Sequence, residues 1–448
     1  MASPDLNQGL ERLYRETGWT LRQFAQEINR LGTERGTPLR YREPSVHQWL
    51  KGHLPKESVR PLILEALARK LSRPITNSEA GFPVSPVEES GALPSTVEGL
   101  LDLGRQDMDP SRRSVLGIGL FSVALTVPNW PDVVGRIEAV QTGKTQRIGL
   151  SDVQSVIAMT ERLSDIDDQF GGRTARPMAA AYLVNTVAPY LRADAPESVR
   201  KAMMAAASDL SYLTGYMAVD EGIHGMAQRY YLKALELAGA SEDHLTYCTT
   251  LRGMSVQAVD LGHGAEAVRL ADAAAAASPQ AGPRMRAFLA GQQAHAAAQE
   301  GNSRIALQRI KEAEVAMNKA ESQPKTFGSY NPSSLAYHMG QVRYELGDVA
   351  GSIASLKESD KLRPSTFRRT SVRYLSMLAE RQLEVGHLET ACETWGRVLE
   401  IYPLVQSGQC DRNIAALHSR IRPYLKNHTA RDLSERARLV TPPNLLTQ

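Results

Sequence analysis

Apolar residues recur with a helical period along almost the whole chain. In the first 74 residues four short apolar stripes follow one another. They consist of Leu6, Leu10 and Leu13; of Leu21, Phe24, Ala25, Ile28 and Leu31; of Val46, Trp49 and Leu50; and of Val59, Leu62, Ile63, Ala66, Leu67 and Leu71. Thr20 precedes the second stripe as the expected N-cap, and Gly52 ends the third. The pattern predicts a compact bundle of four or more helices.

Beyond residue 150 the helical pattern repeats. Helix-breaking glycines stand at Gly222, Gly262, Gly301, Gly347 and Gly386, at intervals of 40, 39, 46 and 39 residues. Small residues stand seven positions before each glycine (Gly215, Ser255, Ala294, Gly340 and Ala379) and five positions after it (Ala227, Ala267, Ala306, Ser352 and Ala391). Because small residues let two helices approach closely, we expect five helix pairs between residues 208 and 403, and an earlier degenerate pair at 178–191.

The pattern lapses between these two regions. Residues 73–113 combine several prolines with acidic residues and keep no apolar period, which predicts a flexible acidic linker. We therefore expect an all-α chain with a bundle at 1–72, the linker at 73–113, a helical region with an apolar segment at 114–207, a repeat domain at 208–425 and a C-terminal tail at 426–448.

The apolar segment follows Arg112 and Arg113 and resembles a twin-arginine export signal. It lies about 110 residues into the chain, behind the predicted bundle, and its apolar core of about 13 residues is short for a bilayer. We expect it to form a buried helix of the second domain, and we do not expect membrane attachment.

Composition is that of a soluble protein with packed cores, since hydrophobic residues make up 42% and charged residues 23% of the 448. Cys248, Cys392 and Cys410 are widely separated and odd in number, so we expect neither a disulfide framework nor a zinc site. We expect no secretory leader and a cytoplasmic location.

No residue pattern predicts catalysis. No two of the ten histidines stand at i and i+4, no Gly-x-Ser-x-Gly occurs, and the carboxylate pair Asp167 and Asp168 has no convergent partner in the sequence. We expect no enzyme activity, no metal and no cofactor.

Positive charge concentrates at the N-terminus. Residues 1–74 carry a formal charge of +5, whereas the whole chain carries +3. Binding to phosphates requires this sign of charge.

Two segments of the bundle resemble the Xre/Cro-repressor class of helix-turn-helix proteins. Residues 20–25, Thr-Leu-Arg-Gln-Phe-Ala, match the second helix of that class, and residues 45–52, Ser-Val-His-Gln-Trp-Leu-Lys-Gly, match its recognition helix, although the intervening turn is about eleven residues longer. The resemblance implies binding to duplex DNA. The expected base-contacting residues are Arg42, Glu43, Ser45 and Gln48, and the expected phosphate-contacting residues are Arg22, Gln23, Arg40, Lys51 and Lys56. If Pro44 is the first helical residue, Glu43 is an N-cap instead of a base reader.

The helix pairs resemble tetratricopeptide repeats, which stack into a solenoid whose concave face is lined by the first helix of each pair. Placed on this chain, the concave positions of that family are Tyr212, Tyr216, Asp220, Arg252, Asp260, His295, Gln299, Tyr337, Gln341, Arg373, Glu380 and Glu384. Such a polar, aromatic groove suits a peptide or protein ligand, and the alternative is that its members are solvated or pack against neighbouring helices.

Together the two resemblances imply a transcriptional regulator, similar to peptide-responsive regulators and to those of filamentous actinobacteria. Its repeats would bind a peptide or protein, or form a homodimer, to control DNA binding. The alternative is a repeat scaffold that sequesters a partner, with a membrane tether at Arg112 and Arg113 as a variant.

Overall fold

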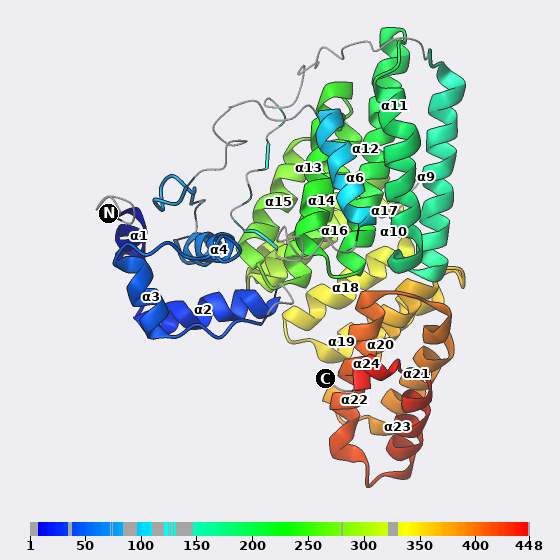
Figure 1. Cartoon of the computed structure of the whole chain (residues 1–448). Helices are drawn as coiled ribbons and strands as arrows, with labels where there is room; N and C mark the ends of the chain where they lie inside the picture. Colours follow the sequence, from blue (N-terminus) through cyan, green and yellow to red (C-terminus); the bar gives the residue numbers. More distant parts are fainter. Residues whose placement is uncertain are drawn as a thin grey trace.

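The computed structural model describes residues 8–34, 38–71, 73, 75–83, 96–109, 121–123, 125, 127–128, 130, 147–278, 281–320 and 330–446. All regular elements of these residues are helical, apart from one isolated bridge between Arg147 and Asp194. The predicted all-α fold is therefore confirmed. Figure 1 shows a small N-terminal group of helices beside a large array of paired helices.

The N-terminal module contains the four predicted helices, α1 (Gln8–Thr17), α2 (Leu21–Glu34), α3 (Glu43–Leu50) and α4 (Arg60–Leu71). Thr20 caps α2 as predicted: its Oγ1 accepts from the backbone N–H of Gln23, and Gln23 Oε1 accepts from the backbone N–H of Thr20. All four apolar stripes contribute to one buried core.

The prediction of a flexible linker at 73–113 is wrong for the described part of that range. Ile75, Ala80 and Phe82 are buried in the core of the N-terminal module, which therefore extends to about residue 83. Helix α6 (Thr96–Met108) buries Leu100 and Leu103 against later helices. Prolines and acidic residues obscured these apolar positions.

The repeat array consists of helix pairs in the predicted positions. The five pairs are α12 (Glu197–Asp220) with α13 (His224–Ser241), α14 (His244–Asp260) with α15 (Gly264–Ala276), α16 (Pro283–Gln299) with α17 (Ser303–Asn318), α18 (Pro332–Glu345) with α19 (Val349–Lys361), and α20 (Arg368–Glu384) with α21 (Leu388–Ile401).

The periodic glycines turn the chain between the helices of each pair. All five have a positive φ, between 76° and 85°, a conformation that glycine adopts without a steric penalty. The predicted small residues lie where the paired helices meet: Ser255 Oγ donates to the carbonyl of Ala267, and Ser352 Oγ donates to the carbonyl of Gly340.

The chain before and after these pairs differs from the predictions. In place of a degenerate pair at 178–191, one long helix runs through α10 (Gly172–Tyr182), a π-helical turn (Leu183–Val187) and α11 (Ala188–Leu191), and it pairs with α9 (Leu150–Phe170). The pair differs from the predicted one because the turn lies before residue 178: Gly171, whose φ is +92°, makes the turn between α9 and α10.

The predicted C-terminal tail at 426–448 is also helical. A short 3-10 turn (Tyr402–Leu404) leads into α22 (Gly408–Ile421), and a second one (Arg422–Tyr424) precedes α23 (His428–Val440) and α24 (Pro443–Leu446). Helix α23 packs against α21 and buries Ala430, Leu433 and Ala437, so the tail completes the last layer of the array.

The array curls back on itself. Helix α20 contacts α9, and the start of α22 reaches the end of α12, so that the C-terminal helices lie against the ends of the first ones (Figure 1). Arg369 Nη2 lies 2.8 Å from Asp167 Oδ2, Ser407 Oγ donates to Asp220 Oδ1 at 2.6 Å, and Gln406 N–H donates to the carbonyl of Phe170. We call Asp167, Asp220, Arg369 and Ser407 the closure cluster.

The described part of the apolar segment is not the predicted buried helix. Residues 111–120, 124 and 126 lie outside the described residues, and residues 121–123, 125 and 127–128 are non-helical. Phe121 is buried, and Val123, Leu125 and Val127 pack against the core of the repeat array. Across the described residues, no helix has both the length and the apolarity needed to cross a membrane.

Candidate functional site

The buried face of helix α3 and the residues that lead into its N-terminus hold this helix in place. Val46 and Trp49 are buried in the module core, and the ring of Tyr41 packs edge-on against Trp49. Asn29 on α2 fixes the same tyrosine: its Nδ2 donates to the Tyr41 carbonyl at 2.9 Å, and its Oδ1 accepts from the Tyr41 N–H at 2.8 Å. These two bonds set where the long turn enters α3.

The predicted base-contacting residues occupy the opposite, outer face of α3. Arg42, Glu43 and Gln48 are exposed and Ser45 is half-buried. The expectation that Pro44 is the first helical residue and Glu43 its N-cap is wrong, because Arg42 takes the N-cap position with extended backbone and Glu43 begins the helix. The Glu43 side chain is therefore free of a capping role.

The predicted phosphate-contacting cations surround this face. Arg22, Arg40, Lys51 and Lys56 are exposed, and within the described residues neither they nor Arg42 form an ion pair with a carboxylate. In contrast, each of the following arginines of the same module pairs with a glutamate: Arg12, Arg15, Arg30, Arg69 and Arg73. A group of cations without ion pairs in the described structure thus lies around α3.

The structure shows the surroundings of Arg22, Arg42 and Gln23 in more detail. Arg22 of α2 and Arg42 line one hollow of about 370 Å³ between α2 and the start of α3, together with Glu43. Gln23, predicted to contact phosphate, uses its side-chain carbonyl in the cap of α2, which leaves its amide N–H groups as the donors to a phosphate.

A second candidate site is a cavity of about 520 Å³ inside the curled array. Four predicted groove residues line it: Tyr212, Tyr216, Arg252 and Tyr337. The aromatic side chains that sequence reasoning missed are Phe288, Tyr330, His338, Phe367 and Tyr374, and the missed charged ones include Asp167, Asp168, Arg363 and Arg369. The cavity is therefore bordered by residues of α9 in addition to those of the predicted first helices of the pairs, among them α20.

The other predicted groove residues serve the packing of the array. Asp220 belongs to the closure cluster, Asp260 pairs with Arg373, Glu380 pairs with Arg420, Gln299 donates to the carbonyl of Val259, and Glu384 accepts from Tyr344. His295 and Gln341 are buried, and Arg381 donates to Gln341. For these eight residues the alternative considered from the sequence, packing against neighbouring helices, describes the structure.

Within the closure cluster, Arg369 is the partner of the α9 carboxylates that the sequence did not reveal. Arg369 faces Asp167, Asp168 and Asp220, at 2.8, 3.5 and 3.6 Å. Burial raises the pKa of Asp167 to about 8, against the opposing charge of Arg369. No local pattern predicts this contact, because Arg369 lies 202 positions away from Asp167.

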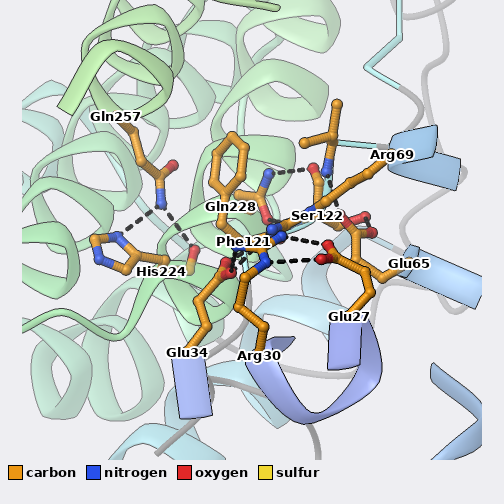
Figure 2. A network of polar contacts seen from close by, with 11 residues as sticks. Glu27, Arg30, Glu34, Glu65, Arg69, Phe121, Ser122, His224, Gln228 and Gln257 are labelled. Atoms are coloured by element: carbon orange, nitrogen blue, oxygen red, sulfur yellow. Dashed lines mark hydrogen bonds and ion pairs between the residues drawn. The ribbon is translucent and has the colours of Figure 1, made fainter. Parts of the chain in front are cut away.

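A third feature joins the N-terminal module to the array (Figure 2). We call residues 121–123 the strap. Arg69 Nη2 donates to the Phe121 carbonyl at 2.7 Å, and Glu65 accepts from Ser122 Oγ at 2.8 Å and from the Val123 N–H at 3.0 Å. On the module side, Arg69 also pairs with Glu34 of α2.

The strap is bound equally firmly on the array side. The Gln228 amide of α13 makes two bonds of 2.8 Å with the backbone of Ser122, one to its N–H and one to its carbonyl. The Phe121 ring stacks on His263 with ring centroids 4.9 Å apart. Burial lowers the pKa values of His224 and His263 to about 4, so both rings beside the strap are neutral at pH 7.

Comparison with protein families gives a match for the N-terminal module. Residues 10–83 match the family model of the SP15 N-terminal domain. That span runs from Leu10 to just beyond Phe82, the first and last members of the module core, so it corresponds to the N-terminal module as the structure delimits it. No curated protein matches the chain. Residues 10–83 are thus similar to the SP15 N-terminal domain.

Proposed function

We propose that the chain is a sequence-specific DNA-binding regulator. Helix α3 would enter the major groove with Arg42, Glu43, Ser45 and Gln48 toward the base edges, and the surrounding cations would contact phosphates. The observation that carries this proposal is the group of exposed cations around α3 that form no ion pair within the described residues, in contrast to five other arginines of the module that pair with glutamates.

We propose further that the repeat array controls this activity by binding a ligand in its cavity. The strap supports such control, since it bonds at once to α4 of the module and to α13 of the array. A ligand alters DNA binding only if it prefers one arrangement of the two parts, with a typical coupling of about 1 to 3 kcal/mol. Two copies of the chain would place two α3 helices on an inverted repeat.

The test is the salt dependence of binding to a duplex of random sequence. The Lys51→Ala variant should bind more weakly and should reduce the slope of log K against log salt by about 1, because one phosphate contact is lost. Arg15→Ala is the matched control, since Arg15 is equally exposed but pairs with Glu11 on α1, and its slope should equal that of the wild type. Absence of duplex binding by the intact chain would favour the scaffold alternative.

A further inference from the structure

Arg252 of α14 lines the cavity without an anionic partner. It is half-buried, and across the described residues no aspartate or glutamate forms an ion pair with it. Uncharged side chains lie beside it: the guanidinium lies 4.1 Å from the centroid of the Phe288 ring, Nη2 lies 3.5 Å from His338 Nε2, and the Tyr212 side chain is a further hydrogen-bond partner. Its Nε is buried and makes no hydrogen bond within the described structure.

The other arginines that line the cavity are paired. Arg369 contacts Asp167 at 2.8 Å, Arg363 contacts Asp360 at 3.3 Å, and Arg162 contacts Asp165 at 3.4 Å. A charge withdrawn from water is costly unless it is paired and hydrogen-bonded. Among these arginines, Arg252 is therefore the one whose charge lacks an anionic partner within the described residues. Its planar guanidinium can donate two parallel hydrogen bonds to the two oxygens of a carboxylate.

Tyr330 provides a second donor beside Arg252. Burial keeps the pKa of His338 well below its ordinary value, so this ring is neutral. Since a guanidinium only donates, His338 Nε2 accepts from Arg252 and Nδ1 carries the proton. His338 Nδ1 lies 2.7 Å from the Tyr330 hydroxyl oxygen and donates its proton to it, which leaves the hydroxyl hydrogen of Tyr330 to donate into the cavity.

The aromatic part of the remaining walls suits a flat ligand body. Tyr337 and Tyr374 stack with centroids 4.0 Å apart and planes 4° from parallel, and Tyr216 and Phe288 line the same space. Aromatic rings recognise other planar groups by stacking or edge contacts. The cavity volume falls within the range of sites for small ligands.

We propose that this cavity binds a carboxylate ligand with an aromatic body, and that Arg252 and Tyr330 hold its carboxylate. This inference rests on the proposed control of the chain by a ligand and specifies the ligand's chemical class. A small aromatic acid and the C-terminus of a short peptide ending in an aromatic residue share this chemistry.

Matched acid and amide probes test the inference by isothermal titration calorimetry. The pairs are 4-hydroxyphenylacetate with 4-hydroxyphenylacetamide, and the peptide Ala-Ala-Tyr with a free or an amidated C-terminus. At least one acid should bind about tenfold to a hundredfold more tightly than its amide, and Arg252→Gln should abolish that difference. The pair that shows it identifies the source. Equal binding of acids and amides in both pairs, or a difference that survives Arg252→Gln, would overturn the inference.

Thermal unfolding adds a readout that needs no ligand. Arg252→Met should leave Tm unchanged or raise it, because it removes a desolvated charge without an anion. Arg363→Met is the matched control in the same cavity and should lower Tm, because it breaks the pair with Asp360. An equal fall of Tm in both variants would make Arg252 a structural residue. Failure of α3 to bind DNA would appear in the duplex assay and would leave both of these readouts unaffected.

Discussion

Replacing Phe121 by alanine should detach the strap without unfolding either part that it joins. The ring is 2% exposed and stacks on His263, and truncation of a buried phenylalanine costs about 3 to 5 kcal/mol. The polar groups on the module side stay satisfied when the strap leaves, since Arg69 keeps its ion pairs with Glu34 and Glu65. The cost therefore falls mainly on attachment of the strap.

Hydrogen exchange at the amides of Ser122 and Val123 measures this cost directly, because these amides donate to Gln228 and Glu65. A loss of about 3 kcal/mol should accelerate their exchange by about a hundredfold, while amides in α20 and α22 keep their wild-type rates. Phe170→Ala is the matched control, since the Phe170 side chain is 42% exposed at the end of α9. Wild-type exchange rates at Ser122 and Val123 in Phe121→Ala would refute the assigned role of the strap.

Three further changes test other parts of the account. Arg369→Met removes the cation that Asp167, Asp168 and Asp220 share, so unfolding experiments should show a loss of about 3 to 5 kcal/mol and small-angle scattering should show a larger radius of gyration; an unchanged Tm would contradict the role of Arg369 in closing the array. Asn29→Ala removes both bonds to the Tyr41 backbone and should cost about 1 to 3 kcal/mol, with weaker duplex binding; full retention of duplex affinity would contradict the positioning of α3. Burial raises the pKa of Asp209 to about 7, so its stabilising contribution is complete below about pH 4 and is lost as the pH rises through 7. Asp209→Asn should therefore match the wild type at pH 4 and exceed it at pH 8 by about 1 to 2 kcal/mol, a value reduced because the residue is only half-buried; equal stability at pH 8 would contradict this reasoning.

The sequence predicts those parts of the fold that depend on local geometry. Gly262 and its counterparts mark the turns because a positive φ selects glycine whatever the surroundings. Ser255 and Ala267 mark a helix contact because close approach requires small side chains. The helices of the N-terminal module follow from their apolar stripes and from the cap at Thr20.

Contacts between distant segments were not predictable in this way. Closure of the array depends on small rotations that accumulate from one helix pair to the next. No residue near Asp167 in the sequence indicates that Arg369 is its partner. The strap belongs to the apolar segment that the sequence predicts to be a buried helix, but its backbone bonds go to the side chains of Glu65 and Gln228. Likewise, the lack of an ion pair at Arg252 can be recognised only from the structure, which shows which carboxylates pair with the other arginines of the cavity.

Selection from a random duplex library with the intact chain tests the central claim most directly. The chain should enrich one defined motif, Gln48→Ala should relax the preference at one base position of that motif, and Lys51→Ala should enrich the same motif with weaker binding throughout. No enriched motif with the intact chain, or an unchanged preference in Gln48→Ala, would contradict the assignment of α3 as the element that reads DNA.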